Sequence, residues 1–312
     1  MIPYSWLVLA GERLRPHIRI TPLTYDPELR IYLKWENHQV TGSFKARGAL
    51  NKVLSLQEGE RLAGLVTASA GNHGQGVALA GGLVGASVLV FASDHAVPEK
   101  IEAMQRLGAQ VRLVTGGYGE AEQAGLKEAR DQHLTWISPY NDGQVIAGQG
   151  TLAMEALAQL GDQRPPTWVV PVGGGGLISG IGAVLAQLNA RPRLVGVQSE
   201  ASPFFHAIYY NGSQEGVAEL PSLADGLAGP VEERSVTIPL IKAYVDDIIL
   251  VTEEEIRQAV VFAWKKYDER LEGSAAVSLA AVLTGKIDSQ AVLILSGGNI
   301  QSEVHRSILE NG

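Results

Sequence analysis

Short runs of β-branched residues alternate with helix-forming stretches along most of the chain. This alternation favours α/β architecture, because parallel strands must be joined by a crossover that is usually helical. Strands are predicted over Ile31–Trp35, Leu62–Thr67, Ser87–Phe91, Gln110–Val114, Trp168–Val172, Arg193–Val197 and Ala291–Leu295. Helices are predicted over Ser43–Leu54, Gly74–Gly81, Pro98–Leu107, Tyr118–Gln132, Ile146–Gln159, Ile178–Leu188, Glu253–Tyr267 and Ala275–Leu283.

One predicted helix has a clear start signal, and a further helix is expected at the N-terminus. Thr252 is a residue type that caps helices, and the acidic residues that follow it place negative charge at the positive end of the predicted helix. Residues Met1–Ala10 are predicted to form a helix that packs on the body of the protein. They lack the basic segment of a signal peptide, and Glu12 follows too soon for a membrane span.

The 312 residues are enough for two lobes around a shared cleft. Strand–helix units follow one another closely between about residues 64 and 136. We therefore expect a small inserted α/β domain over residues 64–141. Residues 1–63 and 142–312 are expected to form a larger, cofactor-binding domain.

The composition argues against several function classes. The net charge is −8 and no basic run is present, so we expect no binding to nucleic acid or to an anionic membrane. The chain has no cysteine, which excludes disulfides, thiolate metal sites and cysteine nucleophiles. Such a composition fits the reducing cytoplasm, which is the expected location.

The most telling segment joins the strand predicted at Trp168 to a helix through Gly173, Gly174, Gly175 and Gly176. Residues without Cβ let backbone N–H groups converge on an oxyanion, and the start of the helix adds its dipole. A plain flexible turn is the alternative, but glycine loses extra entropy on ordering. Neither a P-loop lysine nor the dinucleotide fingerprint is present. We therefore predict that the loop binds the phosphate of another small cofactor.

Lys45 stands in the first turn of a predicted helix, within Thr41–Ala49. A positive charge is unfavourable there, so the pKa of Lys45 is predicted to be lowered, as a Schiff-base amine requires. Read alone, a lysine in a helix is more often a solvated surface residue than a Schiff-base amine.

Two further segments end strands with small polar residues. In Ser69–Gly76 a hydroxyl, an amide and exposed N–H groups are suited to a carboxylate, although an ordinary capped turn has the same pattern. The strand Ala291–Leu295 ends at Ser296, which places a hydroxyl at the carboxyl edge of a sheet, where open α/β folds bind ligands. A plain strand-ending turn remains the alternative.

Taken together and in this order, these segments resemble the fold-type II pyridoxal-phosphate enzymes, and within them the threonine/serine dehydratase and serine racemase group. The resemblance includes Lys34–Ala49, Ser69–Gly76, Val145–Thr151, Pro171–Gly180, Ala224–Gly226, Tyr244–Ile256 and Leu295–Asn299. It implies a tryptophan-synthase-β-like fold with two open twisted-sheet α/β lobes. Pyridoxal 5′-phosphate is expected in the cleft between them.

The resemblance also assigns roles to residues. Lys45 is implied to form the Schiff base with the cofactor, and Phe44 to pack near it. Asn72 is implied to meet the pyridoxal 3′-oxygen, Gly173–Gly176 to hold the phosphate, and Ser296 to face the pyridine nitrogen. Because a serine does not hold that nitrogen protonated, elimination of a β-substituent is favoured.

The substrate-carboxylate loop is implied to consist of Ser69, Ala70, Gly71 and His73. Tyr140 stands where the group lines the substrate side chain; its hydroxyl either meets a polar substrate group or only packs. In serine racemases a serine replaces Ala70 and protonates the opposite face of Cα. Alanine has no proton to exchange, so dehydration is favoured over racemisation.

The implied reaction turns a β-hydroxy amino acid into a 2-oxo acid and ammonia, with neutral Lys45 removing the Cα proton. Threonine, serine, 3-hydroxyaspartate or a bulkier analogue are all open as substrates. Serine racemase, hydroxyaspartate dehydratase and a β-replacement enzyme stay as alternatives, as does a non-catalytic binder. β-Replacement enzymes usually carry threonine where this chain has His73.

Three expectations complete the prediction. The acidic metal ligands of the racemases align near Gln198 and Phe204, so we expect no divalent metal site, while a monovalent ion bound by carbonyls remains open. The chain ends at Gly312, soon after Ser296, which predicts that a C-terminal regulatory domain is absent. By resemblance alone, we expect a homodimer.

Overall fold

The computed structural model describes residues 1–287 and 290–311, and these form an α/β protein with two sheets. The larger sheet has the order β1-β2-β10-β7-β8-β9, and only the pair β1–β2 is antiparallel. Its strands are β1 Leu23–Asp26, β2 Ile31–Trp35, β7 Thr167–Pro171, β8 Arg193–Ser199, β9 Asp247–Val251 and β10 Ala291–Leu295. The smaller sheet is parallel, in the order β5-β4-β3-β6. Its strands are β3 Leu65–Ala68, β4 Val88–Ser93, β5 Gln110–Val114 and β6 Thr135–Trp136.

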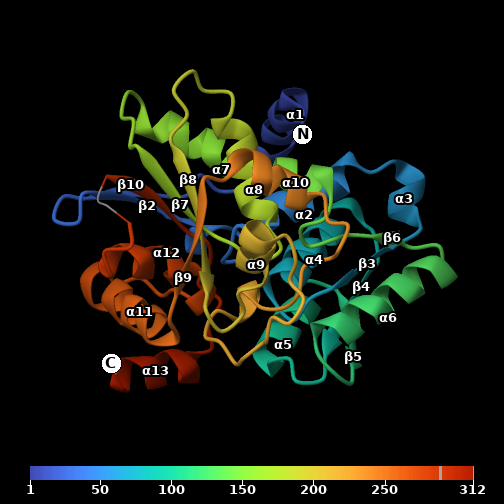
Figure 1. Cartoon of the computed structure of the whole chain (residues 1–312). Helices are drawn as coiled ribbons and strands as arrows, with labels where there is room; N and C mark the ends of the chain where they lie inside the picture. The colour runs from blue at the N-terminus through green and yellow to red at the C-terminus, as the bar shows by residue number, and fades with distance from the viewer. Residues whose placement is uncertain (288–289, 312) are drawn as a thin grey trace.

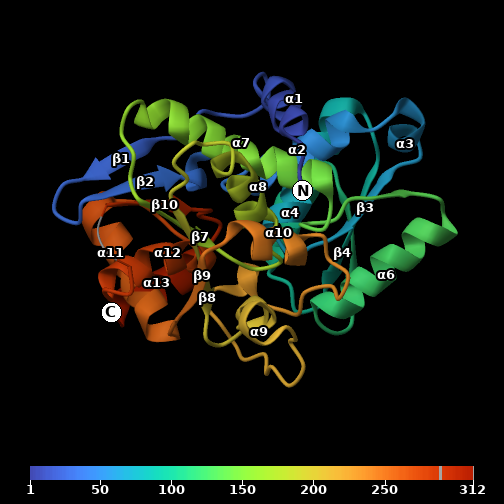
Figure 2. The same cartoon turned by 45° about the horizontal axis from the view of Figure 1, so that its top comes forward.

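Helices cover both sheets, and Figures 1 and 2 show the two sheet regions side by side. The helices are α1 Tyr4–Leu14, α2 Lys45–Ser55, α3 Glu58–Leu62, α4 Asn72–Val84, α5 Pro98–Arg106, α6 Tyr118–Asp131, α7 Gly143–Leu160, α8 Gly176–Leu185, α9 Phe204–Asn211, α10 Thr237–Tyr244, α11 Glu253–Tyr267, α12 Gly273–Leu283 and α13 Ser302–Glu310. Short 3₁₀ turns lie at η1 Glu36–His38 and η2 Asp225–Leu227.

The larger sheet is buried on both faces. In β10, Val292 and Ile294 join the apolar core under α7 and α8, whereas Leu293 and Leu295 join the core under α11 and α12. Successive side chains of a strand point to opposite faces, so a sheet covered on both sides needs a continuous apolar run. This explains why β10 reads Ala-Val-Leu-Ile-Leu without alternation.

Most predicted elements are confirmed, with shifts of a few residues at their ends. The bounds of β2, β5, β10 and α11 agree with the prediction, as does the cap at Thr252, whose hydroxyl accepts from the N–H of Glu255 at 3.1 Å. The N-terminal helix is also present, as α1. The strand predicted from Leu62 is wrong at its start, because α3 runs to that residue and β3 begins at Leu65. The elements β1, β6, β9, α3, α9, α10 and α13 were not predicted.

All strands of the smaller sheet lie between Leu65 and Trp136, which supports the proposal that residues 64–141 form an inserted domain. The core beneath this sheet also takes in α2, whose residues Ala46 and Leu50 pack with Val77 and Val90. The helix α2, which begins with Lys45, therefore contributes to the core beneath the smaller sheet, although it precedes residue 64 in the sequence.

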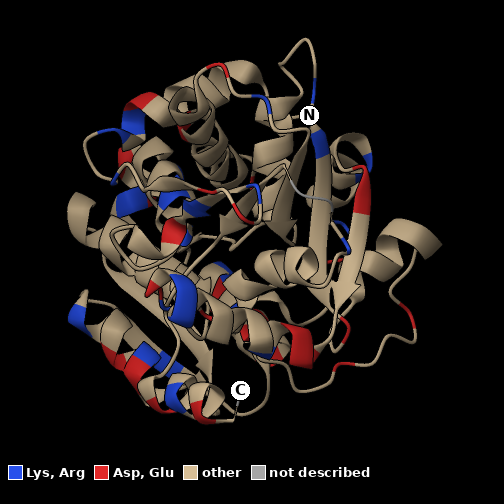
Figure 3. Cartoon of the chain, turned by 90° about the vertical axis from the view of Figure 1, so that its left-hand side faces the viewer, with Lys and Arg blue, Asp and Glu red and all other residues tan. Residues whose placement is uncertain are grey.

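The charge of the protein is dispersed. Basic and acidic residues alternate along the helices at the lower left of Figure 3. In the described part of the chain, no helix combines the length and the apolar character that a bilayer span requires.

Candidate active site

One cavity is lined by the loops that follow the strands of both sheets. Ser69 follows β3, Gly173 follows β7 and Ser296 follows β10, so the carboxyl ends of parallel strands face this space. Every residue predicted for the site lines it: Phe44, Lys45, Ser69, Ala70, Gly71, Asn72, His73, Tyr140, Gly173, Gly174, Gly175, Gly176 and Ser296. Their individual roles toward a cofactor or substrate stay predictions.

Lys45 is the first residue of α2, and its Nζ donates to the carbonyl oxygen of Pro139 at 3.1 Å. The segment before it is tied to the loop after β10. The N–H of Phe44 donates to the carbonyl of Ser296 at 3.0 Å, and Ser43 bridges Gly297 in antiparallel fashion. The position of Lys45 relative to Ser296 is therefore fixed by main-chain hydrogen bonds.

Burial lowers the pKa of Lys45 to about 8, and the nearby carboxyl of Glu272 offsets part of this effect. The predicted direction is confirmed, but the cause found in the structure is loss of solvent, whereas the sequence pointed to the helix terminus. A lysine with such a pKa has a far larger neutral fraction near physiological pH than an ordinary lysine, as nucleophilic and basic chemistry requires.

The glycine loop presents a set of free donors. The N–H groups from Gly173 to Ile178 span the loop and the first residues of α8, which begins at Gly176. Within the described residues, none of them has a hydrogen-bonded protein acceptor. The loop has no room for side chains: a Cβ on Gly174 would lie 2.4 Å from the ring of Tyr140. Gly175 also adopts φ +85°, a conformation that favours glycine. This arrangement fits a phosphate, as predicted from the four glycines.

A second set of free donors lies at the start of α4. The hydroxyl of Ser69 accepts from the N–H of Gly71 at 3.1 Å and so shapes the turn. The N–H groups of Ala70, Asn72, His73 and Gly74 have no acceptor among the described residues. The cavity thus has two separate places for anionic groups, which suits a ligand carrying both a phosphate and a carboxylate.

The side chain of Asn72 is held from both sides. Its Nδ2 donates to Glu272 Oε1 at 2.8 Å, and its Oδ1 accepts from Asn299 Nδ2 at 2.7 Å. Its orientation is therefore set by residues that follow far later in the sequence.

The Nε2 atom of His73 and the hydroxyl of Tyr140 are next to backbone groups, so the two side chains shape the wall of the cavity. Burial, together with the charge of Lys45, lowers the pKa of His73 to about 3, and its Nε2 lies 3.1 Å from the carbonyl oxygen of Ile137. The imidazole is neutral. The ring of Tyr140 packs against Gly174, and its hydroxyl accepts from the N–H of Glu232 at 3.0 Å. The ring of Tyr140 is therefore held by packing, and its hydroxyl oxygen is held by a backbone N–H.

Sequence reasoning missed polar residues that also line the cavity: Lys100, Tyr118, Asp225, Glu272 and Ser274. Glu272 had a local signal, because it immediately precedes Gly273 and the apolar helix α12. A Cβ on Gly273 would lie 2.1 Å from the carbonyl oxygen of Leu223, so glycine is required for this close approach. Lys100 has no comparable local signal.

A buried charge network anchors α2. Arg47, fully buried, donates from Nε to Glu36 Oε2 at 2.7 Å and from Nη2 to Glu36 Oε1 at 2.8 Å. Its Nη2 also lies 3.0 Å from Glu155 Oε2, and Lys34 Nζ lies 2.6 Å from Glu155 Oε1. The positive charges of Lys34 and Arg47 thus compensate the negative charges of Glu36 and Glu155. Arg47 stands two residues after Lys45 in α2, so the network holds the start of this helix in place.

Glu272 provides a test through pH. Burial and the charge of Asp225 raise its pKa from 4.5 to about 7, so between these values the folded protein keeps a proton that the unfolded chain has lost. The stability that this proton provides is present below pH 4.5 and is lost as the pH rises toward 7, by about 3 kcal/mol at most. We expect Glu272→Gln to flatten this fall, measured as the unfolding free energy of cofactor-free protein in urea at pH 5 and pH 7. Equal falls in both proteins would refute the assignment.

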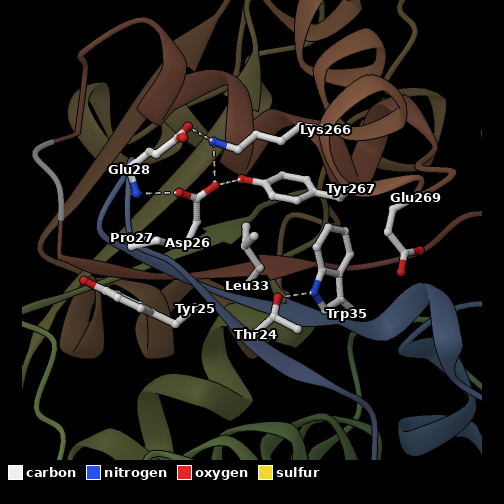
Figure 4. A pocket seen from close by; sticks show the side chains of 10 residues that line it. All are labelled: Thr24, Tyr25, Asp26, Pro27, Glu28, Leu33, Trp35, Lys266, Tyr267 and Glu269. Atoms are coloured by element: carbon white, nitrogen blue, oxygen red, sulfur yellow. Dashed lines mark hydrogen bonds and ion pairs between the residues drawn. The ribbon is translucent and has the colours of Figure 1, made fainter.

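A separate hollow lies beside β1 and the end of α11. Figure 4 shows Lys266 directed at Asp26 and Glu28, with the hydroxyl of Tyr267 donating to Asp26 at 2.6 Å. It contains none of the predicted site residues. We therefore place the predicted chemistry in the cavity lined by Lys45, which contains those residues.

Known proteins are similar to this chain over most of its length. The profile of a family described as "Pyridoxal-phosphate dependent enzyme" matches residues 14–297. The L-threonine ammonia-lyase of Thermotoga maritima is 40% identical over 321 aligned positions, covering 100% of this chain and 79% of that protein. The processed form of threonine deaminase isoform 2 from Solanum lycopersicum superposes with a TM-score of 0.89 at 30% identity, covering 98% and 92% of the two chains. Maize serine racemase gives a TM-score of 0.89 at 27% identity, covering 98% and 96%.

Proposed function

The chain belongs to the family of pyridoxal-phosphate-dependent enzymes, and on that premise we propose that it is an ammonia-lyase acting on L-threonine or L-serine. The products are a 2-oxo acid and ammonia. The observation that carries the proposal is the position of Lys45, a lysine with a pKa of about 8, in a cavity with two sets of free N–H donors.

The residues present fit pyridoxal phosphate. The N–H groups from Gly173 to Ile178 would hold its phosphate, and Lys45 would bind its carbonyl carbon. Phe44 would pack beside the ring, and Ser296 would face the pyridine nitrogen. When bound, the cofactor supplies an electron sink that acidifies the Cα proton of an amino acid and allows its β-hydroxyl to leave.

The protein groups around the substrate have distinct tasks. The N–H groups between Ala70 and Gly74 would bind the carboxylate and orient Cα toward Lys45. Lys45 would act as the base: burial in the cavity lowers its pKa to about 8, so its free amine could take the Cα proton. The side chain of Ala70 cannot return a proton to the other face.

Ala70 makes the balance between lysis and racemisation testable. With L-serine, we expect pyruvate to form at least about tenfold faster than D-serine, because general acid catalysis from the second face is missing. Both products can be followed in one incubation by chiral chromatography and a lactate dehydrogenase assay. Interconversion of the serine enantiomers at the rate of pyruvate formation would show that a racemase is the better description.

The substrate range is tested with a panel of β-hydroxy amino acids. Release of 2-oxo acid from L-threonine or L-serine supports the proposal, while activity confined to 3-hydroxyaspartate would redirect it to that substrate. O-acetylserine with sulfide serves as the control for β-replacement, which the proposal expects to be slow.

We also propose that the enzyme is a cytoplasmic homodimer with residues 64–141 as its smaller domain. The resemblance to the dehydratase group supports the dimer, and the absence of cysteine supports the compartment. Analytical ultracentrifugation of the purified protein tests the dimer directly, since a single species of monomer mass would contradict it.

A further inference from the structure

Lys100, on α5, lies against the turn proposed to hold the substrate carboxylate. A Cβ built on Gly71 lies 3.1 Å from Lys100 Cδ and 3.8 Å from its Nζ. The lysine side chain therefore crosses directly over this glycine. Lys100 and the turn line the same cavity. The N–H groups of Ala70 and Asn72, which flank Gly71 in sequence, have no acceptor among the described residues.

The partner of Lys100 comes from the other half of the molecule. Lys100 Nζ lies 2.7 Å from Asp225 Oδ2 in η2, and the lysine side chain is 16% exposed while that of Asp225 is 56% exposed. Burial lowers the pKa of Lys100, but the carboxylates of Asp225 and Glu272 outweigh it and raise the pKa above its ordinary value. Lys100 is thus a permanent cation. Its largely solvated partner can turn into water at small cost.

A cation beside the free N–H groups would strengthen the binding of a carboxylate at this turn. Among the described residues that line the cavity, the cationic side chains are Lys45 and Lys100, because the imidazole of His73 is neutral. Lys45 is committed to the cofactor. Asp225 and, above its pKa of about 7, Glu272 already add negative charge to the same space, so an added carboxylate without compensation would be repelled.

We propose that Lys100 is a specificity-determining residue that binds the α-carboxylate of the substrate and releases Asp225 when the substrate arrives. This inference rests on the proposed function, because it takes an amino acid as the ligand. Asp225 and the substrate then compete for one ammonium. Removing Lys100 and removing the charge of Asp225 must therefore have opposite effects on carboxylate binding.

The experiment uses holoenzyme and two probes, L-alanine and L-alaninamide. Neither has a β-leaving group, so binding is measured by calorimetric titration without elimination. For Lys100→Gln we expect L-alanine to bind about tenfold more weakly or worse, with less than about a twofold change for the amide. For Asp225→Asn we expect L-alanine to bind about two- to fivefold more tightly. Lys100→Arg, which keeps the charge, should retain most of the preference for the carboxylate.

Lys127→Gln is the matched control, since that lysine pairs with Asp131 on the exposed side of α6. Equal weakening of both probes by Lys100→Gln would overturn the inference, because a purely structural role affects them alike. Weaker binding of L-alanine to Asp225→Asn would also overturn it. If no β-hydroxy amino acid yields a 2-oxo acid while these binding differences hold, the proposed function fails and the carboxylate site stands.

Discussion

Replacing Lys45 by alanine is expected to lower the kcat for 2-oxo acid formation from L-threonine by about 10³-fold or more. A positioned general base contributes on the order of 10²–10⁴-fold, and this lysine is also the group expected to hold the cofactor. Main-chain bonds fix it beside Ser296. Lys100, which lines the same cavity, is paired with Asp225 and has a raised pKa, so it is a poor substitute as a base. The fall is measured by a coupled assay, together with the loss of visible absorbance that the lysine–cofactor linkage gives.

The matched control is Lys127→Ala, at an exposed lysine that does not line the cavity, which should leave kcat unchanged. Unfolding curves of both variants show whether the substitution at Lys45 acts on chemistry or on folding. Retention of a tenth or more of the kcat by Lys45→Ala would exclude the role given to this residue.

The substitution Arg47→Met is expected to lower the free energy of unfolding by about 3–5 kcal/mol. Removing one member of a buried ion pair leaves the other charge without compensation, and that loss exceeds the net contribution of the intact pair. Here Glu36, which is fully buried, would lose both of its hydrogen bonds to the guanidinium, and Glu155 would lose one. The change is measured by urea denaturation monitored by circular dichroism.

Arg106→Met provides the comparison, because Arg106 pairs with Glu102 on the exposed surface of α5. Pairs of that kind contribute less than about 1 kcal/mol, so its effect should be several times smaller. A similar fall in the free energy of unfolding of both variants would mean that the network around Arg47 stabilises the protein no more than an exposed ion pair does.

Local sequence patterns predicted the larger part of the fold. β10 is a continuous apolar run, and the helix start at Thr252 has both a capping residue and acidic first-turn residues; such signals are contained within a few neighbouring positions. The two-residue β6 has no periodicity to detect. In β1 the edge position leaves most of the strand outside the core, so its pattern is weak.

The site could be predicted where its parts are short motifs, as at Gly173–Gly176 and Ser69–Gly76. It could not be predicted where the parts depend on pairing over long distances in the chain. Lys100 meets Asp225 across 125 positions, and Asn72 meets Glu272 across 200. No local pattern contains these contacts, because the packing of the two sheets creates them. The same is true of the pKa of Lys45, which depends on burial that only the folded cavity provides.

The strand order has a consequence for biosynthesis. β10 lies between β2 and β7, and its following loop bridges Ser43 just before Lys45. The middle of the larger sheet is therefore completed by residues that leave the ribosome after both of their neighbours. Until Ala291–Leu295 emerge, the nascent chain carries two unpaired strand edges, and long-range pairing of this kind forms slowly. We therefore expect cofactor capture to wait until Ala291–Leu295 have emerged, and chaperones to bind the incomplete chain, whose apolar surface is still exposed.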